Sequence, residues 1–92
     1  MTSPSPTLTR SPVAELFGPV DATGLGLRLV QPGKVVSVYR TSTDIAAALT
    51  ALARAGRRAH PQLGWTLEFS PVETVLVLAG PDDALAALGL DV

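Results

Sequence analysis

His60 is the side chain in this sequence that is best suited to proton-transfer chemistry. It is the only histidine among 92 residues, and histidine is the only side chain whose unperturbed pKa lies close to neutral pH. The helix predicted just before it carries three arginines, Arg54, Arg57 and Arg58. Trp65 follows at the start of a predicted strand. These five residues are therefore the candidates for a functional surface.

Each of these candidates also has a purely structural interpretation. A histidine at the C-terminal end of a helix interacts favourably with the helix dipole. A cluster of arginines is often no more than a solvated helix face. Trp65 and Phe69 lie on the same face of one predicted strand, which is typical of core packing. The residue types alone leave both interpretations open.

Several other kinds of site are not expected from the composition. The chain has no cysteine, which excludes disulfides, zinc–thiolate sites and thiol nucleophiles. With a single histidine and no cysteine, the chain has too few of the usual ligands, so we expect no transition-metal site built from protein side chains alone. Glu68 and Glu73 are separated by Pro71, and no pattern pairs them as catalytic carboxylates. We therefore expect no catalytic carboxylate pair, no metal and no cofactor.

Charge and hydropathy restrict the partners and the location. The formal net charge of −1 argues against nucleic-acid binding driven by bulk charge. No apolar run approaches the roughly 18 residues that a membrane-spanning helix needs. The N-terminus has no apolar segment typical of a secretory signal. We expect a cytoplasmic protein with no nucleic-acid or membrane partner.

The chain is predicted to hold one domain after an N-terminal tail. Residues 1–12 contain three serines, three prolines and three threonines and have little to bury, so we expect them to be disordered. Residues 13–92 form the domain. A core of this size yields only a few kcal/mol of net stability. Because 47% of the residues are hydrophobic and only 16% are charged, we also expect a buried interface between subunits of a homodimer.

The first half of the domain is predicted to be a short helix and a hairpin. Residues 11–20 place Val13, Leu16 and Phe17 on one helical face, and Gly18-Pro19 is expected to end that helix. Residues 25–30 and 35–40 alternate or are β-branched and read as two strands. The Gln31-Pro32-Gly33-Lys34 segment between them has turn chemistry.

The second half is predicted to repeat helix, strand, strand and helix. A helix from about Asp44 to Arg58 follows the capping candidates in residues 41–44, and Pro61 prevents its continuation. Strands are expected over residues 64–70 and 72–79, the second of them apolar on both faces and therefore central. Asp82 and Asp83 are expected to cap a last short helix. The order α-β-β-α-β-β-α predicts an α+β, two-layer domain with a four-stranded antiparallel sheet and helices on one face.

This order, with His-Pro at the end of the central helix, resembles the pterin-4a-carbinolamine dehydratase family. The family pattern has a helix ending in His-His-Pro, a strand ending near Thr-His, and a last helix with Asp followed by Leu-Ala. Here the corresponding segments are Ala59-His60-Pro61, Leu78-Ala79 and Asp83-Ala84-Leu85-Ala86. The resemblance extends over roughly residues 25–90. It rests on the order of these motifs along the chain.

The departures from the family pattern fall on its histidines. The first histidine of His-His-Pro corresponds to Ala59, and the Thr-His histidine corresponds to about Ala79. A positioned acid–base group typically contributes about 10²–10⁴-fold to a rate, and alanine can neither donate nor accept a proton. The resemblance therefore implies a chain that has lost most of a pterin site and has no catalytic residue.

The family also includes degenerate-site members associated with α-carboxysomes, which act as Rubisco assembly factors in carbon fixation. This chain is similar to them in its missing histidines. The resemblance then implies a non-catalytic, dimeric chaperone for Rubisco whose client-binding residues are Arg54, Arg57, Arg58, His60 and Trp65.

Two alternatives stay open at this stage. The chain is a working pterin dehydratase if His60 alone supplies the acid–base chemistry, and its substrate is then the carbinolamine. A small structural module of a virion or another assembly is the third interpretation, based on a looser similarity of the strand and helix order.

Overall fold

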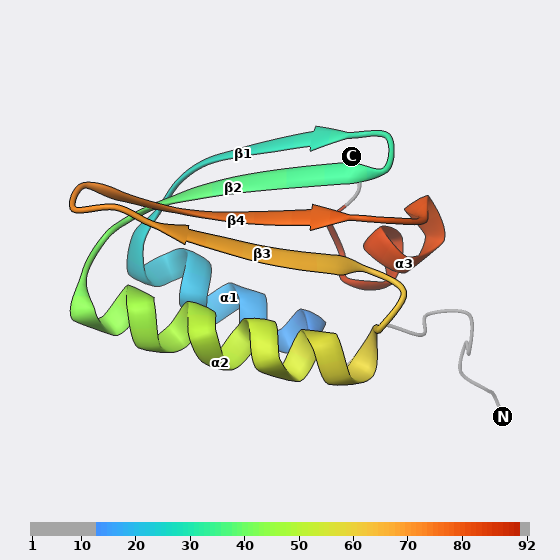
Figure 1. Ribbon diagram of the computed structural model, residues 1–92, viewed down its shortest axis with the longest axis horizontal. Coiled ribbons are helices and arrows are strands. Elements are labelled where there is room, and N and C mark those ends of the chain that lie inside the picture. Colours follow the sequence, from blue (N-terminus) through green and yellow to red (C-terminus); the bar gives the residue numbers. More distant parts are fainter. Residues whose placement is uncertain (1–12, 91–92) are drawn as a thin grey trace, which may run out of the picture.

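The computed structural model describes residues 13–90, so the predicted disordered tail lies outside the described residues. Figure 1 shows three helices and four strands in the predicted order. Their bounds are α1 Ala14–Gly24, β1 Leu25–Gln31, β2 Lys34–Arg40, α2 Thr43–Ala59, β3 Gly64–Phe69, β4 Glu73–Ala79 and α3 Asp82–Ala87. The α+β prediction is therefore confirmed.

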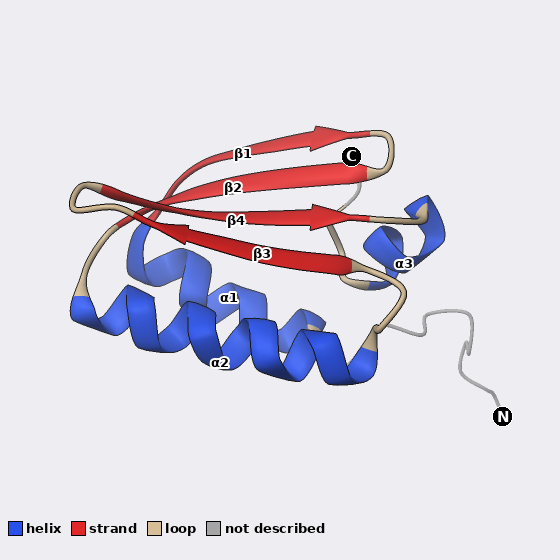
Figure 2. Cartoon of the chain, in the orientation of Figure 1, coloured by secondary structure: helices blue, strands red, loops and turns tan. Residues whose placement is uncertain are grey.

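The four strands form one antiparallel sheet in the order β1-β2-β4-β3. Both hairpins, β1–β2 and β3–β4, place their second strand in the centre, which confirms the central position expected for β4. The helices lie on one side of the sheet, and the other side carries no helix (Figure 2). The molecule thus has two layers, and one face of the sheet is uncovered.

The first helix differs from its prediction. It continues through Gly18-Pro19 and ends at Gly24, although a proline inside a helix removes one hydrogen bond and costs about 3 kcal/mol. The turn beyond Pro19 is held by tertiary contacts, because Val20 is buried and Asp21 binds partners on the sheet. Local sequence signals contain no trace of those partners, so the prediction that the helix stops at Pro19 was wrong.

The turn between β3 and β4 also differs slightly from expectation. Val72 was expected at the start of a strand, but it lies in the turn and is 72% exposed. The backbone N–H and the hydroxyl of Ser70 both donate to the carbonyl of Glu73, at 3.0 and 2.5 Å. The N–H of Glu73 in turn donates to the Ser70 hydroxyl, at 3.1 Å. These bonds close the turn and start β4 at Glu73.

The central helix α2 begins and ends where its sequence signals place it. The hydroxyl of Ser42 accepts a hydrogen bond from the N–H of Ile45 at 3.1 Å, which is a helix N-cap. His60 is the C-cap residue, and its N–H donates to the carbonyl of Gly56 at 2.7 Å. Pro61 follows in the turn that leads to β3.

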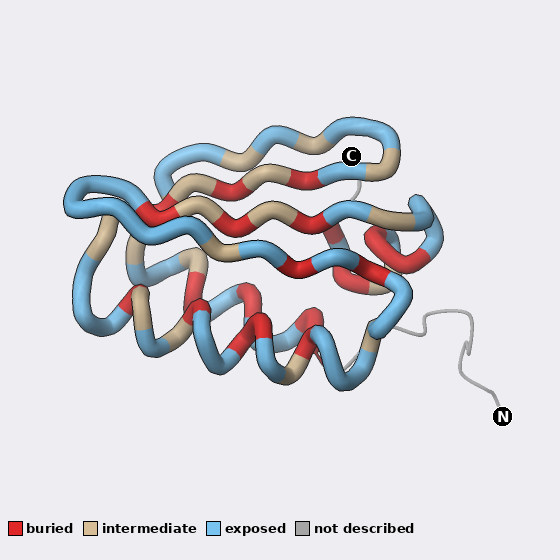
Figure 3. The backbone as a smooth tube through the Cα atoms, in the orientation of Figure 1, coloured by how far each residue is buried: buried red, intermediate tan, exposed pale blue. Residues whose placement is uncertain are grey.

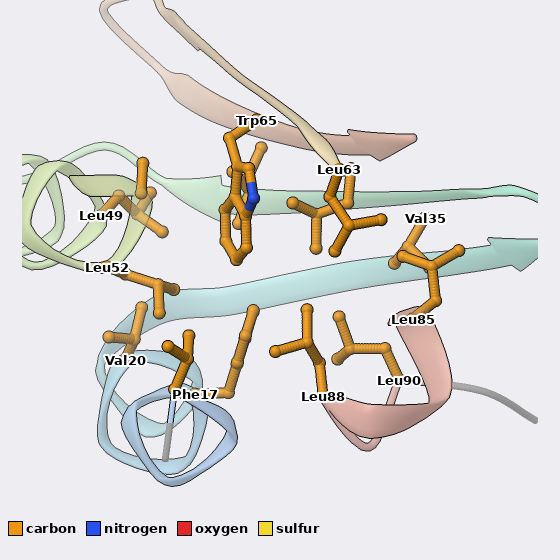
Figure 4. Close-up of a cluster of buried hydrophobic side chains, with 14 of the residues drawn as sticks. Phe17, Val20, Val35, Leu49, Leu52, Leu63, Trp65, Leu85, Leu88 and Leu90 are labelled. Atoms are coloured by element: carbon orange, nitrogen blue, oxygen red, sulfur yellow. The ribbon is translucent and has the colours of Figure 1, made fainter. Parts of the chain in front are cut away.

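The core lies between the sheet and the helices (Figures 3 and 4). Buried side chains come from every helix and from strands β2, β3 and β4, so the layers are held by one continuous cluster. Its largest fully buried apolar members are Tyr39, Ile45, Leu49, Leu52, Leu76, Leu78 and Leu88.

Candidate functional site

The predicted site residues gather at the C-terminal end of α2. The carbonyl of His60 accepts a hydrogen bond from the N–H of Leu63 at 3.1 Å, which folds residues 60–63 into a tight connection to β3. Gly64 then pairs with Ala79 at the far end of β4. The structure therefore places Ala59, His60 and Ala79 at the same end of the molecule, although 18 residues separate His60 from Ala79 in the chain.

Glycine at position 80 permits the close packing at this end. A Cβ on Gly80 would come within 2.6 Å of Leu63 Cδ2 and 3.1 Å of the Gln62 carbonyl oxygen. The backbone at Gly80 also has φ +156°, which side chains rarely adopt. The 60–63 connection can therefore lie directly on the β4 end only because this residue is glycine.

Two of the three positions where the resemblance would lead one to expect histidine carry methyl groups. Ala59 and Ala79 are both exposed, and His60 is half-buried. A methyl group neither titrates nor forms hydrogen bonds. Among these three positions, His60 is therefore the only one whose side chain can transfer a proton.

The arginines of α2 present positive charge to solvent beside His60. Arg54, Arg57 and Arg58 are all exposed, and the one ion pair within residues 13–90 joins other residues. Arg57 is the best positioned of the three, because its Nη2 donates to the carbonyl of Trp65 at 2.9 Å. This bond holds the last turn of α2 against β3 and fixes one charge in the cluster.

Trp65 lies in the core and not on this surface. It is 5% exposed, and Figure 4 shows its indole pointing from β3 into the layer between the sheet and the helices. Its ring lies 6.5 Å from that of Phe17, and a Cβ on Gly56 would come within 2.2 Å of it. Its indole N–H is buried and has no acceptor within the described residues. Of the five predicted contact residues, the three arginines are therefore exposed, His60 is half-buried and Trp65 lies in the core.

A second polar cluster, absent from the sequence analysis, connects α1 to the sheet. Arg28 of β1 binds Asp21 through two parallel hydrogen bonds of 2.8 and 2.9 Å. The hydroxyl of Tyr39 donates to Asp21 Oδ1 at 2.7 Å and accepts from Arg28 Nη2 at 2.9 Å. Arg28 Nε donates to the hydroxyl of Ser37 at 2.8 Å. The guanidinium carbon of Arg28 also lies 5.5 Å from the centre of the Phe17 ring.

The electrostatics of this cluster fit a structural role. Burial, followed by the hydrogen bond and the negative charge of Asp21, raises the pKa of Tyr39. Burial opposes the charge of Arg28, but the hydrogen bond to Asp21 and the nearby Tyr39 and Asp21 raise the pKa of Arg28 overall. Tyr39 therefore stays protonated and Arg28 stays charged. Neither can act as a general base near neutral pH.

One signal in the sequence could have revealed this cluster. Arg28 alternates with Leu27 and Leu29, so it must point to the opposite face of β1. If that face were the covered one, the charge would require a buried partner. Asp21 and Tyr39 are the groups that satisfy it.

Two surface hollows lie near α3. The larger, of about 470 Å³, lies between the β1–β2 turn and α3, where Asp82 Oδ1 accepts a 2.6 Å hydrogen bond from the N–H of Gly33. Asp82 thus ties α3 to the turn, while Asp83 Oδ1 accepts from the N–H of Ala84 at 2.9 Å. The smaller hollow, of about 330 Å³, includes Asp21 and Arg28 in its lining. Neither includes His60 or the arginines of α2.

The described residues offer no obvious metal or membrane site. No group of three or more histidine, cysteine, aspartate or glutamate side chains within residues 13–90 is arranged to hold a metal ion. No helix in that part of the chain is long and apolar enough to cross a membrane.

Comparisons with family models, with curated proteins and with solved structures find no match to this chain.

Proposed function

We propose that this protein is a non-catalytic, pterin-dehydratase-like assembly factor, and that its client is Rubisco. The observation that carries the proposal is the basic end of α2, where the exposed Arg54, Arg57 and Arg58 lie next to the half-buried His60. Beside it are two positions where the family has histidine and this chain has alanine. The arginines of this surface can bind an oppositely charged partner, but the surface has few groups that could act in acid–base catalysis. Association with α-carboxysomes is part of the same proposal, because it comes with the resemblance.

Binding through this surface is expected to be electrostatic. Guanidinium groups form paired, charge-assisted hydrogen bonds with carboxylates, so the matching client patch is acidic. The bond from Arg57 to the Trp65 carbonyl preorganises one of these groups and reduces the entropy lost on binding. Exposed charge pairs are screened by salt, so binding should weaken as the ionic strength rises.

The absence of catalysis is argued from the dehydration reaction itself. Loss of water from a carbinolamine needs a proton donated to the leaving hydroxyl and a proton removed from nitrogen. His60 can serve one of these steps, and the methyl groups of Ala59 and Ala79 can serve neither. A pterin dehydratase that depends on His60 alone is the alternative that the experiments below must exclude.

The binding test is sedimentation or native mass spectrometry of the full chain with purified Rubisco large subunit and with the assembled enzyme. We expect a complex that Arg54→Glu and Arg58→Glu together weaken at least tenfold. Lys34→Glu is the control for Arg58→Glu alone, because each of these replaces one cation by one anion, and Lys34 lies on β2 and not on α2. No complex at low salt, or equal weakening by the control, would contradict the proposal.

The catalytic test is a carbinolamine dehydration assay with the wild-type chain and with His60→Ala. We expect no rate above the uncatalysed background from either protein. Turnover by the wild-type chain that is lost in His60→Ala would establish the enzyme alternative instead.

A further inference from the structure

The uncovered face of the sheet carries a contiguous apolar surface. Side chains directly opposite each other on paired strands point to the same side, so the pairs Leu27–Val38, Leu29–Val36, Val36–Val77 and Val38–Val75 share a face. Their neighbours Val35, Tyr39, Leu76 and Leu78 are at most 1% exposed and face the helices. We call this surface the open face; its apolar residues are Leu27, Leu29, Val36, Val38, Val75 and Val77. Thr66 and Glu68 of β3 lie opposite Val77 and Val75 and form its polar border.

The open face is unusual for a monomer. Leu27 is 52% exposed and Leu29 is 47% exposed, and the four valines beside them occupy the two central strands. Figure 1 shows that no helix lies on this side. Scattered apolar side chains are ordinary on a protein surface, but a continuous patch over three strands marks an interaction site.

We propose that the open face is the interface of a homodimer in which two sheets stack face to face. This proposal does not depend on the proposed function, because it rests on different residues on the opposite side of the sheet. It commits to a second copy of this chain as the partner.

The charges at the border of the open face favour a second copy. Arg40 and Glu73 are opposite each other on β2 and β4, at one end of the valine rows, and both are exposed. The one ion pair within residues 13–90 is elsewhere, so these two charges are available to a partner. A two-fold axis parallel to the strands, between β2 and β4, places Arg40 of each copy over Glu73 of the other. The same rotation stacks the valines of β2 on those of β4.

The area also fits a small dimer. The whole sheet face, with strands about 4.8 Å apart and up to seven residues long at about 3.3 Å each, has a projected area of about 440 Å². The three strands that carry the apolar residues make up about 330 Å² of it, and β3 adds a polar border. Accessible area follows the relief of the side chains and exceeds this projection, which brings it toward the roughly 600–800 Å² per partner of specific interfaces. Stacked sheets cross at about 30°, an offset that the long arginine side chains can span. We expect a dissociation constant on the order of micromolar.

Sedimentation equilibrium of the full chain over a wide concentration range tests this proposal. We expect a monomer–dimer equilibrium that Val38→Lys shifts at least tenfold toward monomer. Leu16→Lys is the matched control, because Leu16 is 42% exposed but lies on α1, in the helix layer, and it should leave the equilibrium unchanged. Val36→Lys is the second variant if Val38→Lys does not fold, as judged by circular dichroism.

A charge swap tests the proposed axis. Arg40→Glu should weaken the dimer because it brings two carboxylates together in both symmetry-related contacts at the charged end of the interface. Adding Glu73→Arg should restore it. A wild-type chain that stays monomeric at all concentrations would overturn the proposal, even if it bound an amphipathic helix instead. A dimer insensitive to Val38→Lys would overturn it too, since its contact would then be a sheet edge or a helix.

Discussion

The two faces of the sheet divide polar and apolar side chains in an unexpected way. The face covered by helices contains Arg28, Ser37 and Tyr39, and Asp21 of α1 joins them there. The open face contains leucines and valines, bordered by charged and polar residues at one end and on β3. The difference teaches that polar groups can be buried beside the apolar core where they satisfy one another, while apolar groups on the open face keep part of their surface exposed.

The largest contrast should come from two neighbours on β4 that point to opposite faces. Leu76 is fully buried, so Leu76→Ala should lower the free energy of unfolding by about 2–5 kcal/mol. Val77 lies on the open face, so Val77→Ala should cost about 1 kcal/mol or less in the monomer. Urea denaturation of dilute protein measures both. Similar losses in the two variants would mean that the open face is as important to the monomer as the core.

The polar cluster of the covered face should be the next most sensitive feature. Arg28→Met leaves the carboxylate of Asp21 partly buried without its cation and should cost about 2–3 kcal/mol. Asp21→Asn in the same chain should recover part of that loss, because the unpaired charge is then gone. The coupling between the two substitutions is read from a double-mutant cycle of urea midpoints. If the stability losses of the two single variants simply add in the double variant, Arg28 and Asp21 do not stabilise the fold as a pair.

Two glycine substitutions compare a closely packed position between α2 and β3 with a position on α1 that has no neighbouring atoms. Gly56→Ala gains up to about 1 kcal/mol in helix propensity but forces a Cβ to within 2.2 Å of the Trp65 ring, so a net loss of about 1–2 kcal/mol is expected. Gly18→Ala in α1 meets nothing within 4 Å and should gain up to about 1 kcal/mol. Thermal unfolding of both variants checks this. Stabilisation by Gly56→Ala would mean that α2 and β3 can separate at little cost.

The smallest effect should appear at high pH. The chain has one tyrosine, so the ultraviolet absorbance of tyrosinate reports on Tyr39 alone. Because its folded pKa is raised above the unfolded value of about 10, the unfolded state loses its proton first. Stability should therefore be unaffected below about pH 10 and fall above it, by at most about 1.4 kcal/mol per pH unit. Tyr39→Phe should flatten this decline. A phenol in the folded protein that titrates with an ordinary pKa would contradict the buried cluster.

Much of the architecture could be predicted from local signals. The hairpin turn at residues 31–34, the N-cap candidates before α2 and the stop at Pro61 are all short-range patterns, and the structure confirms them. The prediction failed at Pro19 because the contacts that carry α1 past it come from β1 and β2. For the candidate site, alternation placed Trp65 and Phe69 on one face, but only packing against Gly56 and Phe17 shows how deeply Trp65 is buried.

The amino-acid sequence by itself determined the elements, their order and which side chains share a face, because these follow from backbone preferences and from periods of 2 and 3.6 residues. The tertiary structure decided which face of β1 is covered, because a period of 2 is the same viewed from either side. It also brought Asp21, Arg28 and Tyr39 together, and it placed His60 and Ala79 at one end of the molecule. These juxtapositions depend on long-range pairing, which no local pattern encodes.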